Sequence, residues 1–260
     1  VVDTLGAGTF SPRSLELVTV DGKLIGVPSD SWAQMLVYRK DLFEKAGLAA
    51  PTTYETILAA AKALNKDGVA GIVAATGPAD SFTQQTFEYF ALANGCQLTD
   101  DAGAITLNSP QCIDAFKFYT DMIQNGSVAG VQDADTTRAA YFAGDAAMIV
   151  WSSFLLDELA GLRNDALPTC DECTADPMFL ANNSGIVTAV GGPAGSPTQF
   201  GEEVAFVIGA DADVAASQQF VEYMMNDGYV DWLGPAPEGK FPTRLGTAEN
   251  PTQFTAAWGQ

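Results

Sequence analysis

The chain of 260 residues contains no histidine, and this limits the chemistry that its side chains can perform. Ser-His-Asp and Cys-His nucleophilic schemes both need an imidazole, as does any zinc site with imidazole ligands. Paired carboxylates for glycoside hydrolysis are available among 32 Asp and Glu residues, but nothing marks one pair out. No glycine-rich loop that holds a phosphate precedes a helix. We therefore expect that the protein is not an enzyme and that it has no cofactor or metal.

Two aromatic residues at the end of an apolar strand are the first candidate binding residues. The run 147–150 is apolar and ends abruptly at Trp151, with Phe154 three residues later. In open α/β sheets, ligands bind outside the carboxyl ends of the strands. A flat ring offers apolar surface to a ligand, so Trp151 and Phe154 compete for this role. A core position for Trp151 is the alternative.

Polar side chains stand at two other places next to a predicted strand. Asp30, Ser31 and Trp32 follow a short β-rich run, and their alternative role is a solvated turn. Glu202 and Glu203 are adjacent carboxylates before another strand. Successive side chains in a strand point to opposite faces, so at most one of the two faces a ligand.

A glutamine pair and one arginine complete the candidate set. Gln84 and Gln85 follow a buried strand, but Ser81 and Gln84 also match a helix capping box, which needs no ligand. Arg244, with Lys240 nearby, can pair bidentately with a carboxylate or with two hydroxyls. A surface salt bridge is the alternative for Arg244.

Strands that alternate with helices must position these side chains, and the alternation indicates an α/β fold with the sheet in the middle. The sequence predicts strands within 16–27 and at 35–38, 68–75, 146–151, 185–190 and 204–208. It predicts helices at 52–65, 81–93, 136–142, 154–162 and 214–226, and one that opens at Ser109 and Pro110. Thr52 and Glu55 are expected to form a capping box.

The sequence also predicts how the chain passes between two strands near its start and which side of one helix faces the core. Residues 28–31 are expected to form a polar crossing between two strands. In the helix that opens at Pro110, the residues expected to face the core are Cys112, Phe116, Tyr119 and Ile123.

The composition is that of a soluble globular protein with a strongly acidic surface. The net charge is −20, and the 12 Lys and Arg residues form no cluster, which argues against nucleic acid as a partner. The acidity indicates either solubility outside the cell or attraction of a cationic ligand. No apolar run approaches the roughly 20 residues that a membrane helix needs.

Three pieces in order resemble the extracellular solute-binding proteins of ABC importers, in the sugar-binding branch that includes maltose-binding proteins. They are GKLIGVP at 22–28, QMLVYRKDLFEKAG at 34–47 and PTTYE at 51–55. The resemblance continues more thinly to Arg244, through 229–233 and 237–244.

The resemblance implies a type II periplasmic-binding-protein-like fold of two lobes, with the second lobe complete and the first partial. Family members begin with a half-lobe that has no counterpart here, so we expect a fragment. The expected parts are 1–29 as partial first lobe and hinge strand, 30–200 as second lobe, 201–245 as return to the first lobe, and 246–260 as the start of a return to the second.

The resemblance also implies a function. The whole protein is expected to capture a sugar or oligosaccharide by hinge closure and to present it to the membrane subunits of an ABC transporter. It is expected to be an extracellular or periplasmic monomer, with any lipid anchor on an N-terminal segment absent here. A binding protein for a cationic or amine-bearing solute, a carbohydrate-active enzyme and an adhesive surface domain are the alternatives.

Within the family, an aromatic residue just past the strand at 146–151 stacks on the sugar, which implies this role for Trp151 or Phe154. The family places polar contacts at the first crossing, near Asp30 and Trp32. At the second crossing it has Gly or an aromatic residue, so Glu202 and Glu203 depart from the pattern.

An even number of cysteines in a chain that resembles a secreted family favours disulfides. Cys96 and Cys112 flank an expected hairpin whose ends lie close together. Cys170 and Cys173 form a C-x-x-C with two acidic residues between them, which raise thiol pKa values and favour a local structural disulfide over redox chemistry or metal binding.

Overall fold

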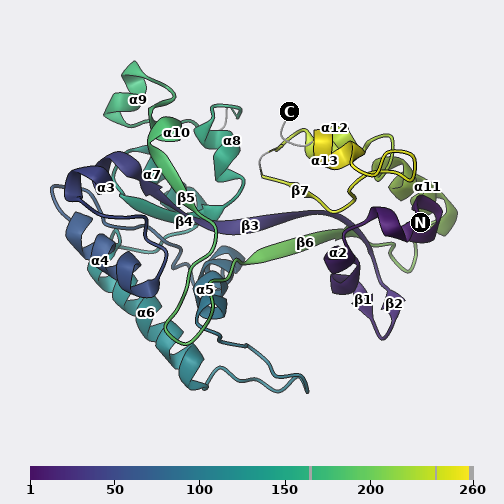
Figure 1. Ribbon diagram of the computed structural model, residues 1–260, viewed down its shortest axis with the longest axis horizontal. Coiled ribbons are helices and arrows are strands. Elements are labelled where there is room, and N and C mark those ends of the chain that lie inside the picture. Colours follow the sequence, from purple (N-terminus) through teal and green to yellow (C-terminus); the bar gives the residue numbers. More distant parts are fainter. Residues whose placement is uncertain (164–165, 238, 258–260) are drawn as a thin grey trace. The chain divides into compact units, whose positions relative to one another are not determined.

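The computed structural model describes residues 1–163, 166–237 and 239–257 (Figure 1). The chain divides into two compact units. Unit 1 consists of Val1–Trp32 and Gly201–Gln260, and unit 2 of Ala33–Phe200.

One long strand, β3 (Val27–Arg39), contributes to both units. We expected a polar crossing at 28–31, but these residues are part of the continuous strand. The extended backbone continues because its polar groups find partners: the Ser29 hydroxyl donates to the Val204 carbonyl, and Asp30 is paired with Pro242 of β7 (Phe241–Pro242).

Unit 2 is built on a sheet in which β3 lies between two antiparallel partners. These are β4 (Met148–Ser152) and β5 (Ser184–Val187). The segment expected as a strand at 68–75 is buried from residue 70 to residue 75, but only isolated parallel bridges, Ala70 to Ala146 and Val73 to Ile149, join it to its neighbour.

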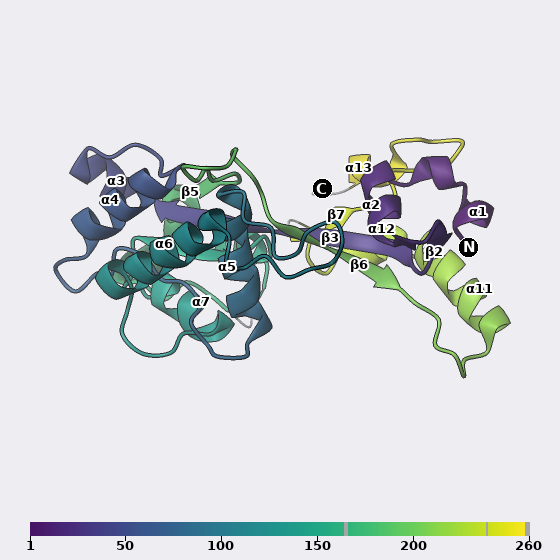
Figure 2. The same ribbon diagram turned by 90° about the horizontal axis from the view of Figure 1, so that it is seen from below.

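Eight helices among the described residues of unit 2 cover this sheet, and Figures 1 and 2 both show α4 beside α6. They are α3 (Lys40–Ala46), α4 (Tyr54–Leu64), α5 (Ser81–Ala93), α6 (Pro110–Gly126), α7 (Ala134–Phe142), α8 (Leu155–Leu159), α9 (Asp171–Ala175) and α10 (Phe179–Asn183).

Two helix starts differ from the expected caps. Helix α4 is capped by Thr53, whose Oγ1 accepts from the Thr56 N–H while the Thr56 hydroxyl accepts from the Thr53 N–H. The capping box is therefore one residue later than Thr52 and Glu55. Helix α5 is capped by Asp80, so the box predicted from Ser81 and Gln84 is also wrong. In both cases a neighbouring Thr or Asp can cap equally well.

Helix α6 buries Cys112 as expected, but the rest of its buried face is shifted, with Tyr119 and Ile123 only partly buried. Its buried residues are Cys112, Ala115, Phe118, Met122 and Gly126. Phe116 is 45% exposed and stacks on Phe87, with ring centroids 4.3 Å apart. The register is set at Gly126, where an added Cβ would lie 2.9 Å from the Ala61 Cβ. This close approach leaves no room for a Cβ at position 126. It turns the side of the helix that carries residues 112, 115, 118 and 122 toward the core.

Both disulfides are present, which confirms the two predicted pairings. Cys96 and Cys112 have Cα atoms 4.6 Å apart, and Cys170 and Cys173 have Cα atoms 4.9 Å apart.

Unit 1 combines two segments of the chain around a small core. The first segment holds α1 (Val2–Leu5), the 3-10 turn Ala7–Thr9, α2 (Pro12–Leu17) and the hairpin of β1 (Thr19–Val20) and β2 (Lys23–Leu24). The second holds β6 (Gly201–Phe206), which pairs with β3, then α11 (Val214–Met224), α12 (Tyr229–Leu233), β7 and α13 (Gln253–Ala257).

The end of the described chain belongs to unit 1. We expected residues 246–260 to start a return to the second lobe. Instead, Phe254 of α13 is fully buried in the core of unit 1, with its ring centroid 4.9 Å from that of Tyr229. No helix among the described residues is long and apolar enough to cross a bilayer.

Candidate functional site

The two aromatic candidates after β4 differ in accessibility. Trp151 is only 8% exposed, and its Nε1 donates to the Ala134 carbonyl at 3.0 Å. Its ring lies 5.7 Å from the Phe82 ring and 5.6 Å from the Arg138 guanidinium carbon. Phe154 lies at the edge of the same core and is only partly buried. Phe154 is therefore the one of the two that offers ring surface.

Three buried side-chain oxygen atoms on β3 and at the start of α5 have no hydrogen-bond partner among the described residues. They are Gln34 Oε1, Asp80 Oδ2 and Thr83 Oγ1, and we call them the acceptor cluster. Asp80 and Thr83 are three residues apart at the start of α5 and so lie on one face. Gln34 joins them through its Nε2, which donates at 3.4 Å to Thr86, one helical turn after Thr83.

An unpaired buried acceptor costs free energy unless a donor reaches it. The acceptor cluster is thus suited to hydroxyl donors. It lies near the end of β4, because Gln34 is opposite Ser152 in the β3–β4 register and the ring of Phe82, at the start of α5, lies 5.7 Å from the Trp151 ring.

Sequence reasoning missed this cluster and named Gln84 and Gln85 instead. Gln84 is exposed, and its Nε2 donates to Glu88 at 2.8 Å on the same helix. Gln85 is partly buried. The sequence offered one indication of Gln34, which is that its polar side chain stands within an otherwise apolar part of β3.

In unit 1, Asp30 is the centre of a second polar group. It is 3% exposed, and its Oδ1 accepts from the Ser29 hydroxyl and from Trp232 Nε1, both at 2.9 Å. Lys240 Nζ donates to the Trp232 carbonyl at 3.0 Å and lies 3.7 Å from the centroid of the indole. Burial lowers the pKa of Lys240, and the negative charge of Asp30 partly opposes this. Trp32 is partly buried.

The adjacent acids on β6 are both partly buried. Glu203 Oε2 accepts from the Ser14 hydroxyl at 3.2 Å, whereas its Oε1 is buried without a partner among the described residues. Burial raises the pKa of Glu203 to about 7, and the nearby Asp30 adds to the effect while the Ser14 hydrogen bond opposes it. Glu203 is therefore not a permanent anion at neutral pH.

Arg244 is not at the surface, where the expected bidentate pairing with a ligand or the alternative salt bridge would place it. It is 2% exposed, and its guanidinium donates to Thr9 Oγ1, Leu5 O and Asn226 Oδ1, each at 3.1 Å, and to Met225 O. It instead joins the N-terminal segment of unit 1 to α11.

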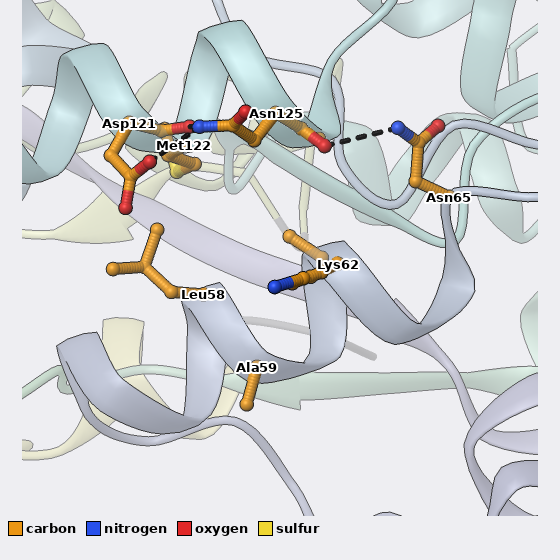
Figure 3. Close-up of a pocket in the computed structure, with 9 residues that line it drawn as sticks. Leu58, Ala59, Lys62, Asn65, Asp121, Met122 and Asn125 are labelled. Carbon is orange, nitrogen blue, oxygen red and sulfur yellow. Dashed lines mark hydrogen bonds between the residues drawn. The ribbon is translucent and has the colours of Figure 1, made fainter.

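A separate hollow of about 480 Å³ lies between α4 and α6 (Figure 3). Figure 3 shows Lys62 and Asp121 on the facing helices, and Asn65 Nδ2 donates to the Asn125 carbonyl at 3.0 Å. It shares no residue with the acceptor cluster or with the Asp30 group. No group of three or more metal-ligating side chains occurs in residues 1–163, 166–237 and 239–257.

Comparison with known proteins gives these sites a context. The putative ABC transporter periplasmic-binding protein YcjN of Escherichia coli (strain K12) is 27% identical over 262 residues, which cover 99% of this chain and 56% of that protein. The chain thus spans little more than half the length of this curated relative.

Solved structures show the same fold. Maltose-bound MalE3 of T. maritima matches with a TM-score of 0.77 and 23% identity over 98% of this chain and 63% of that one. The solute-binding protein of Agrobacterium radiobacter K84 in complex with ribitol matches with a TM-score of 0.76 and 22% identity over 99% and 63%. The expected type II periplasmic-binding-protein fold is thereby confirmed.

The model of the bacterial extracellular solute-binding protein family matches residues 2–258, and the chain belongs to that family.

Proposed function

We propose that the full-length protein is the solute-binding component of an ABC transporter and that its solute is a sugar or polyol. The family match over residues 2–258 carries the proposal. The curated relative is named as an ABC transporter periplasmic-binding protein, and the two solved structures are described with maltose and with ribitol.

The side chains of unit 2 suit such a solute. A polyol or pyranose has C–H surface that packs on an aromatic ring, which Phe154 supplies at the edge of its core. It also has hydroxyl donors, which Gln34, Asp80 and Thr83 accept through oxygens that lack partners among the described residues.

The proposed mechanism is closure of two lobes on the solute. A solute that contacts both lobes only in the closed form shifts the population toward closure. The membrane subunits of the transporter then recognise the closed form. The protein acts outside the cytoplasmic membrane as a monomer, by binding without catalysis, and a lipid anchor would lie on a segment preceding Val1.

Thermal unfolding of the full-length protein with a panel of sugars and polyols tests the proposal. A solute at 100 times its dissociation constant adds about 2.7 kcal/mol to the free energy of unfolding, which raises the melting temperature. Stabilisation by amines such as spermidine, with none by any sugar or polyol, would overturn the choice of solute. New reducing ends after incubation with oligosaccharides would show an enzyme instead.

A further inference from the structure

The two acidic residues of the C-x-x-C segment line a hollow of unit 2 that the proposed function does not use. Its volume is about 350 Å³, and we call it the Arg39 hollow after its one buried charged residue. Asp171 and Glu172 line it together with Asp145 and Gly144. It shares no residue with the acceptor cluster or with the hollow between α4 and α6.

Arg39 places a fixed positive charge at this hollow. It is 3% exposed, and its guanidinium carbon lies 5.2 Å from the centroid of the Phe179 ring. Its Nε and Nη2 donate to the two carboxylate oxygens of Asp41 at 2.8 Å and 2.7 Å. Burial lowers the pKa of Arg39, but the Asp41 pair and the charge of Glu172 raise it further, so the pKa lies above its ordinary value.

The third terminal nitrogen of Arg39 is open to a ligand. Nη1 donates to no residue that the structure describes. Gly144, with φ of +83°, leaves the space beside it free: an added Cβ would lie 3.8 Å from Nη1 and 3.3 Å from the Cys170 Cβ. A buried donor without a partner favours a ligand with an oxygen acceptor, and a carboxylate forms the strongest hydrogen bond with a guanidinium.

Three carboxylates surround the same hollow and favour a cationic group. Asp145, Asp171 and Glu172 are exposed, and no ion pair joins them to a described residue. The disulfide on either side of Asp171 and Glu172, with Cα atoms 4.9 Å apart, holds these two in place. Within the described part of the chain no group of three acidic side chains suits a metal ion, so the carboxylates fit organic ammonium groups better.

We propose that the Arg39 hollow binds a basic amino acid, with its carboxylate on Arg39 Nη1 and its cationic groups among the carboxylates of residues 145, 171 and 172. Arg39 and Asp41 neutralise each other in their ion pair, so the remaining carboxylates make the hollow net negative. A basic amino acid carries one carboxylate and two cationic groups, and is therefore a net cation. This site is separate from the solute site proposed above and does not depend on which solute is bound there.

Calorimetric titration of the full-length protein with L-lysine and with cadaverine tests the role of Arg39. Cadaverine is lysine without its carboxylate, so it keeps the cationic groups and lacks the acceptor for Nη1. We expect cadaverine to bind at least about tenfold more weakly than L-lysine, because it cannot pair with the guanidinium. Equal affinities of the two compounds, or no heat from L-lysine at millimolar concentration, would overturn the proposal.

Three variants of the full-length protein locate the bound lysine. Glu172→Gln removes a carboxylate of the hollow and should weaken lysine binding by about two- to fivefold. Glu55→Gln makes the same change at an exposed residue outside the hollow, and Phe154→Ala changes the proposed solute site, so both should leave lysine binding unchanged. Equal affinities in Glu172→Gln and Glu55→Gln would overturn the proposal. Loss of lysine binding in Phe154→Ala alone would also overturn it, because lysine would then occupy the solute site.

Discussion

Trp232 donates its indole N–H to the Asp30 carboxylate across 2.9 Å, although the two residues are 202 positions apart in the chain. Asp30 lies on β3 and Trp232 on α12, so the bond connects the two segments that make up unit 1. The acceptor is a buried carboxylate, and hydrogen bonds to charged groups are stronger than neutral ones.

We expect Trp232→Phe to lower the free energy of unfolding by about 1.5–3 kcal/mol, because it removes one donor from a buried carboxylate. The measurement is the midpoint of urea unfolding followed by fluorescence. Tyr223→Phe, which changes a side chain that is 55% exposed in the same unit, is the control and should be neutral. Equal midpoints for the two variants would show that the Trp232 bond contributes nothing.

The raised pKa of Glu203 predicts how the free energy of unfolding changes with pH. Its pKa rises from an ordinary value of 4.5 to about 7 in the folded state. Between these values the folded state holds more protons than the unfolded state, so stability falls as pH rises from about 4.5 to 7. The fall should not exceed about 1–2 kcal/mol, because a half-buried carboxylate is screened by solvent.

Urea midpoints measured at several pH values check this, and Glu203→Gln should remove the decline. Glu202→Gln makes the same change in charge one residue away and should leave the decline in place. If Glu203→Gln follows the same pH curve as the unmodified protein, another group is responsible.

The two disulfides should differ in their contribution to stability. Cys96 and Cys112 are 16 positions apart, whereas Cys170 and Cys173 are only 3 apart. A crosslink restricts the unfolded chain more when it closes a longer loop, which gives about 3 kcal/mol for the first and about 2 kcal/mol for the second. Chemical denaturation of two variants, each with one cysteine pair replaced by serine, measures the two contributions to the free energy of unfolding. A larger loss of unfolding free energy for the 170–173 pair than for the 96–112 pair would contradict the prediction.

Substitution of Phe154 should affect solute binding, whereas substitution of Trp151 should affect the free energy of unfolding. Phe154→Ala removes a partly exposed ring and should weaken binding of the proposed sugar or polyol by about 1–3 kcal/mol while the protein stays folded. Trp151→Ala empties a core position and should cost about 3–5 kcal/mol of unfolding free energy. Calorimetric titration and thermal unfolding measure the two effects. Full affinity in Phe154→Ala would remove this residue from the site.

Local sequence signals predicted the elements well where one answer was available. Pro110 after Ser109 fixed the start of α6, and the Cys96–Cys112 pairing followed from a short expected hairpin in a chain that resembles a secreted family. Where two neighbouring residues suited one role, the prediction named the wrong one: Thr53 caps α4, although Thr52 was expected to do so.

The site was predicted less well, because exposure depends on tertiary packing. Nothing local distinguishes Trp151, which Phe82 and Arg138 enclose, from Phe154, which stays at the edge. Arg244 is a charged residue in a loop, yet backbone carbonyls from distant segments surround it. Gln34 became a candidate only when its oxygen was found without a partner among the described residues.

All four cysteines lie in unit 2, so the covalent links of the molecule are distributed unequally. A newly synthesised chain with free thiols would have the full set of noncovalent contacts in unit 1 but a less stable unit 2. Oxidation of these thiols would complete only unit 2. Loss of the disulfides is therefore expected to destabilise unit 2 directly and to leave the noncovalent contacts within unit 1 in place.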